Sequence, residues 1–114
     1  MQVNFRKYAQ AQDMISLIMK EKNLSAEEAV SYAISKDSYV AIRIKKYGYY
    51  GLAFWGHDNE ERKWNVLDKP VLNLQLSEMQ EMLLADIETY LRVTREEAIS
   101  YFLVFTMESL GYHI

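Results

Sequence analysis

The N-terminal third of the chain repeats apolar residues at the three- and four-residue spacing of an amphipathic helix. This spacing predicts a helix over residues 6–22. Ser25, with Glu28 three residues later, is a capping box at the start of the next apolar pattern. It predicts a second helix over residues 26–35, which Lys36-Asp37-Ser38 would end.

The C-terminal third has the same pattern of two capped helices. Ser77 and Gln80 form a capping box ahead of a helix that is apolar on one side. Thr94 is the next predicted cap, with Glu97 in the box position, and the helix that follows covers residues 95–109. This last helix is apolar nearly all round, which is typical of a helix at the centre of a core.

The middle of the chain alternates apolar and polar residues with the period of a β-strand. Residues 39–45 alternate strictly, and we expect further strands over 49–55 and 61–66, with a short edge strand over 72–76. The predicted order is ααβββ(β)αα. It indicates an α+β fold in which an antiparallel three- to four-stranded meander is flanked by two αα-hairpins.

The two predicted hairpins share a sequence. Residues 24–32 (LSAEEAVSY) match residues 93–101 (VTREEAISY) at a spacing of about 69, and five of the nine positions are identical. Capping chemistry alone explains the hydroxyl and the acids, but not the shared alanine, serine and tyrosine. Two explanations are therefore open, independent capping sequences or an internal duplication with a pseudo-two-fold axis. Under a duplication, two pairs would have equivalent packing roles: Ser31 with Ser100, and Tyr32 with Tyr101.

Composition agrees with one globular domain over residues 1–114, half hydrophobic and one quarter charged. Cysteine is absent, which excludes disulfides, thiolate metal sites and a cysteine nucleophile. The chain start does not have a secretory pattern, and no apolar run approaches the roughly 20 residues of a membrane span. We therefore expect a cytoplasmic protein with no membrane partner.

Charge is spread unevenly along the chain. The net charge is −3, which argues against bulk attraction to nucleic acid. The middle is mildly basic and the C-terminal part is acidic. In that acidic part, three carboxylates are predicted to share a helix face that would suit a basic partner by complementarity: Glu78, Glu81 and Glu88.

The outward face of the predicted meander is the other candidate binding surface. Rings stack on bases and cations contact phosphates, and the same side chains also dominate protein interfaces. A homodimer interface, or a solvated face with cross-strand cation–π pairs, would use the same mixture. The predicted residues of this face are Tyr39, Arg43, Lys45, Tyr49, Trp55 and Lys63.

Signatures of enzymes are missing from the sequence. There is no glycine-rich phosphate loop, serine elbow or His-x-x-x-His motif, so we expect no catalysis, metal or cofactor. The acidic run after His57 matches no metal-ligand spacing and is typical of a solvated loop. A helix-turn-helix over residues 12–35 is disfavoured, because Glu27 and Glu28 stand where DNA phosphates would bind.

These observations favour a small non-catalytic protein-binding module that regulates or inhibits a partner protein. Small acidic proteins of this kind are often immunity proteins, antitoxins or phage-encoded inhibitors, an analogy of class alone. The alternative is binding of single-stranded nucleic acid through the aromatic and basic sheet face.

Overall fold

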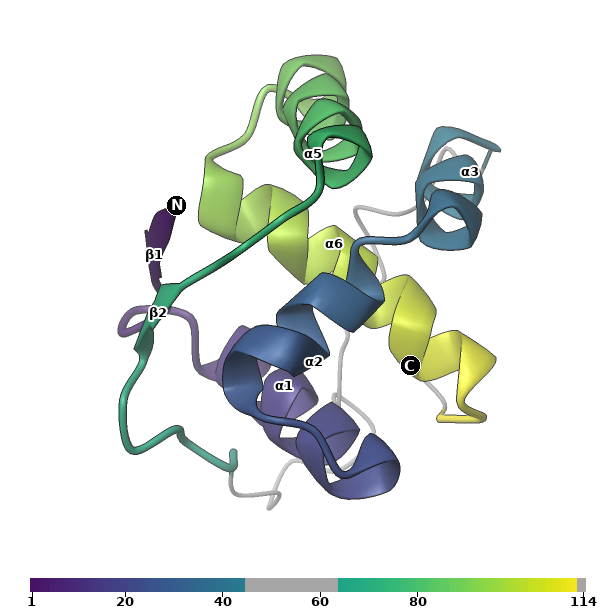
Figure 1. Ribbon diagram of the computed structural model, residues 1–114. Coiled ribbons are helices and arrows are strands. Elements are labelled where there is room, and N and C mark those ends of the chain that lie inside the picture. The colour runs from purple at the N-terminus through teal and green to yellow at the C-terminus, as the bar shows by residue number, and fades with distance from the viewer. Residues whose placement is uncertain (45–63, 113–114) are drawn as a thin grey trace.

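Two helical hairpins, each preceded by a short strand, make up most of the described chain (Figure 1). The computed structural model describes residues 1–44 and 64–112. In chain order the elements are β1 (Gln2–Asn4), α1 (Ala9–Lys22), α2 (Ala26–Ala33), α3 (Lys36–Ile44), β2 (Val71–Asn73), α5 (Glu78–Leu91) and α6 (Arg95–Ser109).

The prediction of a three- to four-stranded meander between the hairpins is wrong. The described structure is 65% helix and its sheet has two strands. Residues 36–44, which cover most of the first predicted strand, form α3. The second predicted strand, 49–55, lies outside the described residues, and residues 64–66 of the third have no regular structure.

A serine hydroxyl explains why α3 is a helix. The Ser35 side chain accepts the backbone N–H of Ser38 at 3.1 Å, so it caps a new helix where the sequence suggested a break. The alternating apolar positions then fall on different sides of that helix. Ile42 is buried, whereas Val40 and Ile44 are 42% and 73% exposed.

The two strands form an antiparallel ribbon. Val3 lies opposite Leu72, and both are buried. Backbone hydrogen bonds extend the pairing beyond the strands, since Met1 and Leu74 exchange two of them and Phe5 donates to the Pro70 carbonyl at 2.9 Å. The predicted edge strand therefore exists as Val71–Asn73, but its partner is the N-terminal segment.

The repeat extends beyond the matched sequence, because one offset relates whole elements. The first residues of α1 and α5, Ala9 and Glu78, differ by 69, as do the last residues, Lys22 and Leu91. Each of these helices ends in a left-handed residue, Asn23 at φ 55° and Arg92 at φ 56°. The strands and the N-caps have the same offset, so the repeated unit is β-α-α.

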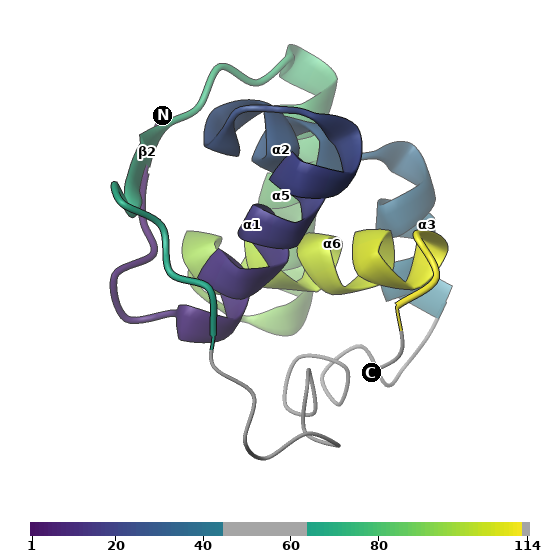
Figure 2. The ribbon, with the colours of Figure 1, turned by 90° about the horizontal axis from the view of Figure 1, so that it is seen from below.

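The register of the ribbon is itself two-fold. Gln2 pairs with Asn73, and Asn4 pairs with Val71, on either side of the central Val3–Leu72 pair. Exchanging each residue for its equivalent 69 positions away leaves this pairing unchanged. A pseudo-two-fold axis therefore passes through the central pair. In both views the ribbon lies at one edge of the molecule and α3 at the opposite edge (Figures 1 and 2).

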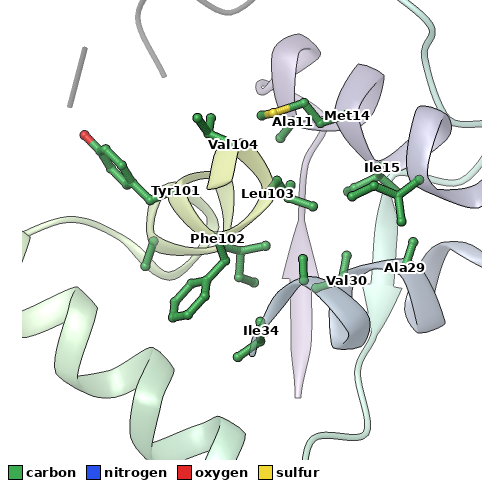
Figure 3. Close-up of a cluster of buried hydrophobic side chains, with 14 of the residues drawn as sticks. Ala11, Met14, Ile15, Ala29, Val30, Ile34, Tyr101, Phe102, Leu103 and Val104 are labelled. Carbon is green, nitrogen blue, oxygen red and sulfur yellow. The ribbon is translucent and has the colours of Figure 1, made fainter. Parts of the chain in front are cut away.

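The core is built around α6, as its apolar sequence predicts. Residues 98–107 are all buried, and α6 packs against α1, α2, α3 and α5. Figure 3 shows Phe102 and Leu103 of α6 among side chains of the first hairpin, including Val30, Ile34 and Ile15. No helix in the described ranges is long and apolar enough to cross a bilayer.

The expected equivalence of the repeated tyrosines and serines is wrong. Tyr101 is 2% exposed and Tyr32 is 44% exposed, because α6 packs against α1, α2, α3 and α5 whereas α2 packs mainly against α1 and α6. Ser100 donates to a carbonyl of its own helix, whereas Ser31 bonds to Gln80 of α5. The repeated elements therefore hold their equivalent side chains in different surroundings.

Candidate nucleic-acid interface

Two residues of the predicted sheet face, Tyr39 and Arg43, lie one turn apart on α3 and contact α5. The Tyr39 hydroxyl donates to Asp86 Oδ2 at 2.8 Å, and Arg43 Nη1 lies 3.9 Å from the same oxygen. The Arg43 guanidinium carbon is 4.1 Å from the centre of the Tyr90 ring. Donation to a carboxylate raises the pKa of Tyr39. These residues join α3 to α5, and the remaining predicted members lie outside the described residues: Lys45, Tyr49, Trp55 and Lys63.

The predicted acidic helix face divides into two parts. Glu78 and Glu81 are exposed in the first turn of α5. Glu88 is half-buried, and its Oε1 lies 3.8 Å from Arg95 Nε at the start of α6. Only the first pair is therefore available at the helix surface for a partner.

The outward face of the ribbon carries amide side chains. Gln2, Asn4 and Asn73 are exposed, while the alternate residues beneath them, Val3 and Leu72, belong to the core. An amide offers a donor and an acceptor side by side. Register places Gln2 directly opposite Asn73. Two exposed polar residues lie beyond the ends of the paired segments: Arg6, in the turn after Phe5, and Gln75.

Our sequence interpretation missed this row. The strands are three residues long, which is too short for alternation to stand out, and β1 pairs with a strand about 70 positions away. A usable signal was nevertheless present. Extending the repeat upstream by the same offset aligns residues 2–6 (QVNFR) with residues 71–75 (VLNLQ), which share the alternation and a central asparagine.

Carboxylates lie along both sides of the ribbon. Asn4 donates its backbone N–H to Glu96 Oε2 of α6 at 3.0 Å. The equivalent residue on α2, Glu27, lines a hollow of about 600 Å³ together with Asn73. Asn4 also accepts the Arg6 backbone N–H on its side-chain oxygen at 2.9 Å. The strand edge beside Asn4 is therefore already satisfied by protein groups.

Exposed cations gather at one end of the ribbon. Arg6 and Lys7 lie in the turn one residue after β1. Lys69 precedes Pro70, whose carbonyl accepts the Phe5 N–H, so it lies at the same end. Glu96 lies near this end as well, in a hollow lined by Arg6 and Lys7. This basic end contrasts with the amide end, where Gln2, Asn73 and Gln75 lie.

Elsewhere, a hollow of about 540 Å³ between α3 and α6 contains hydroxyl groups. Two hydrogen bonds connect these hydroxyls, one from Ser35 to Ser38 at 3.1 Å and one between Ser38 and Thr106 at 3.3 Å. They link α3 to α6 and therefore have a structural role. In residues 1–44 and 64–112, no three potential metal-ligating side chains lie together. The acidic run after His57 falls outside those ranges.

Comparison of the chain with protein-family models, curated proteins and solved structures found no match. What the protein binds is therefore inferred from its described side chains.

Proposed function

We propose that the protein binds duplex DNA by placing the β1–β2 ribbon in the major groove. The single observation that carries this proposal is the row of exposed amides on a two-stranded antiparallel ribbon. The major groove is wide enough for such a ribbon, and proteins that read DNA with paired strands use this geometry.

The side chains of the row match the chemistry of base edges. Asparagine and glutamine bind adenine through two hydrogen bonds, and arginine does the same with guanine. Gln2, Asn4 and Asn73 supply the amides, and Arg6 supplies a guanidinium. Val71, which lies half-buried opposite Asn4, offers the apolar contact that a thymine methyl group accepts.

The ribbon is also held in place before it meets a ligand. Its inward side chains are buried: Val3, Phe5, Leu72 and Leu74. Reading groups on a rigid scaffold lose little conformational entropy on binding. A duplex fits better than a single strand, since single-strand binding relies on aromatic stacking and the outward row contains no ring. The nucleic-acid hypothesis thus moves from the sheet face to the ribbon.

Electrostatics predict weak binding to random sequence. The net charge is −3, and Glu27 and Glu96 lie beside the ribbon. With Arg6 assigned to a base, two nearby cations, Lys7 and Lys69, are left for phosphates. At about 0.9 counterions released for each phosphate, we expect a slope of about −2 for log affinity against log salt. Base contacts must then supply most of the selectivity.

The test is selection from duplexes with a random core at about 50 mM salt. We expect a short enriched sequence. Replacing both asparagines, Asn4→Ala with Asn73→Ala, should weaken binding to that sequence by at least about tenfold. The control Thr89→Ala, on α5, should bind normally. Failure to enrich any sequence, or equal binding by the asparagine variant, would overturn the proposal.

A second function, docking of a protein partner, is favoured by the exposed apolar side chains of α5. Met79 and Met82 are 54% and 68% exposed, and methionine is common at adaptable binding surfaces. Glu78 and Glu81 lie beside them on the same helix. The partner chemistry we propose is an apolar surface bordered by lysine or arginine, consistent with a regulator that acts through a basic partner.

Selection from a displayed peptide library tests this second function. Enriched peptides should combine apolar and basic residues, and they should lose binding to Met82→Glu and associate more slowly with Glu81→Lys. Thr89→Ala serves again as the control. Peptides without basic residues would contradict it, as would a homodimer in sedimentation that Met82→Glu dissociates, because a second copy would then occupy the face.

A further inference from the structure

We infer that the DNA site is non-palindromic, with a guanine-containing half at the basic end of the ribbon and an adenine-rich half at the amide end. This inference rests on the proposed DNA binding. Its basis is that a pseudo-two-fold backbone presents different side chains at equivalent outward positions. A symmetric scaffold would otherwise favour a site with equal halves.

The order of the reading groups follows from the register. Asn4 and Val71 form one facing pair and Gln2 and Asn73 the next, with Arg6 in the turn beyond the first pair. The row ends at Gln75, beyond the Met1–Leu74 pair. The paired segment from Phe5–Pro70 to Met1–Leu74 spans four residue steps. At about 3.3 Å each these give about 13 Å, which corresponds to about four base pairs, with Arg6 and Gln75 just beyond the two ends.

The equivalent positions show where the halves differ. Asn4 and Asn73 are equivalents under the 69-residue offset, so both halves have an amide at the same distance from the axis. Beyond the paired segment, the positions related by the offset have Arg6, in a turn, in one half and Gln75 in the other. Arginine prefers guanine and glutamine prefers adenine, so the outer base should differ between halves.

The inner position also differs between the halves. Gln2, at the amide end, is equivalent to Val71, at the basic end. The amide of Gln2 can form two hydrogen bonds with adenine, whereas a valine side chain can only contact a thymine methyl group. Three amides therefore read the amide end, and one amide, one guanidinium and one apolar side chain read the basic end.

Charge sets the orientation of the protein on such a site. Each end of the ribbon has a neighbouring carboxylate, Glu96 at the basic end and Glu27 at the amide end. Arg6, Lys7 and Lys69 offset the carboxylate at the basic end. At the amide end the neighbouring cation is Lys22, which lies over Tyr32 in the lining of the hollow that contains Glu27. Phosphate contacts should therefore be stronger on the guanine-containing half, which places the protein in one direction along the duplex.

The experiment is to sequence the duplexes that the unmodified protein and Arg6→Gln select, with Lys36→Gln as a surface-cation control. The unmodified protein should enrich unequal halves, with guanine at one outer position. Arg6→Gln makes the outer residues identical, so its preference for guanine over adenine there should fall by about tenfold or more. Lys36→Gln should select the original site. Circular dichroism verifies that each variant is folded.

The outcomes separate the two claims. Enrichment of a site with equal halves, or an unchanged guanine preference in Arg6→Gln, overturns the inference and leaves the proposed function standing. Failure to enrich any duplex overturns both.

Discussion

The two β-α-α halves of the molecule have the same order of elements, but their equivalent side chains lie in different surroundings. β1, α1 and α2 begin at positions that differ by 69 from those of β2, α5 and α6. Yet Tyr32 in the first half is 44% exposed, and its equivalent Tyr101 is buried. The comparison teaches that caps and strand register preserve a repeat, while the side chains between them are free to diverge.

One position accounts for the largest backbone difference. α2 ends at Ala33, and Ser35 caps a new helix that packs on α6. The equivalent of Ser35 in the second half is Val104, which is buried within the unbroken helix α6. A hydroxyl that competes for backbone N–H groups ends one helix, and an aliphatic side chain lets the other continue.

Replacing the equivalent tyrosines with alanine should give the largest difference in stability between the two halves. Tyr101→Ala leaves a cavity in the core and should lower the free energy of unfolding by about 3 kcal/mol or more. Tyr32→Ala removes an exposed ring beside Lys22 and should cost less than about 1 kcal/mol. Urea denaturation measures both, and equal losses would contradict the assigned burial.

Removing the Ser35 cap should have the next largest effect. Ser35→Ala deprives the Ser38 N–H of its acceptor and should cost about 1 kcal/mol in urea denaturation. Ser35→Asp keeps an acceptor at that position and is the matched control. If both variants lost the same stability, the hydroxyl would not be the cause of the helix break.

Neutralising the carboxylates beside the ribbon should sharpen the comparison between the two halves, because each half contributes one of these carboxylates. Glu27→Gln and Glu96→Gln each remove a charge that repels phosphate, and the amide oxygen introduced at position 96 can still accept the Asn4 N–H. Each variant should tighten binding to a selected duplex by about two- to fivefold, an effect that high salt reduces. Fluorescence anisotropy titrations measure this change in affinity. Weaker binding by either variant would argue against DNA lying beside these carboxylates.

A smaller difference concerns how the stability contributed by two helix caps, at Ser25 and Ser77, depends on pH. The Ser25 N–H donates to Glu28 at 3.0 Å, which lowers the pKa of Glu28 below its usual 4.5. The folded state thus favours the carboxylate, so its contribution is present above the unfolded pKa and is lost as pH falls through the folded pKa. At Ser77 the corresponding partner is Gln80, which does not titrate.

Glu28→Gln should make the cap at Ser25 as insensitive to pH as the cap at Ser77. Its unfolding free energy should lose less on acidification below pH 4.5 than that of the unmodified protein. Urea midpoints across this pH range provide the measurement. Parallel acid profiles for the two proteins would show that the Ser25–Glu28 bond makes no pH-dependent contribution.

The sequence predicted the parts of the fold that depend on local chemistry. The capping serines at 25 and 77 and the helix over residues 95–109 occur where they were expected, because caps are formed by residues three positions apart. The ribbon depends on pairing between residues about 70 positions apart, which a short strand does not reveal. Arg43 illustrates the opposite error, since its alternating neighbours indicated a strand and the Ser35 cap produced a helix.

The most direct test of ribbon recognition is an NMR titration of the protein with a selected duplex, following side-chain and backbone amides. We expect the largest shifts in the side-chain amides of Gln2, Asn4 and Asn73, with little change at the backbone amides of Ile42 and Arg43 on the opposite edge. Shifts concentrated on α3 and α5, with the ribbon amides unmoved, would contradict the account and favour the protein-docking face.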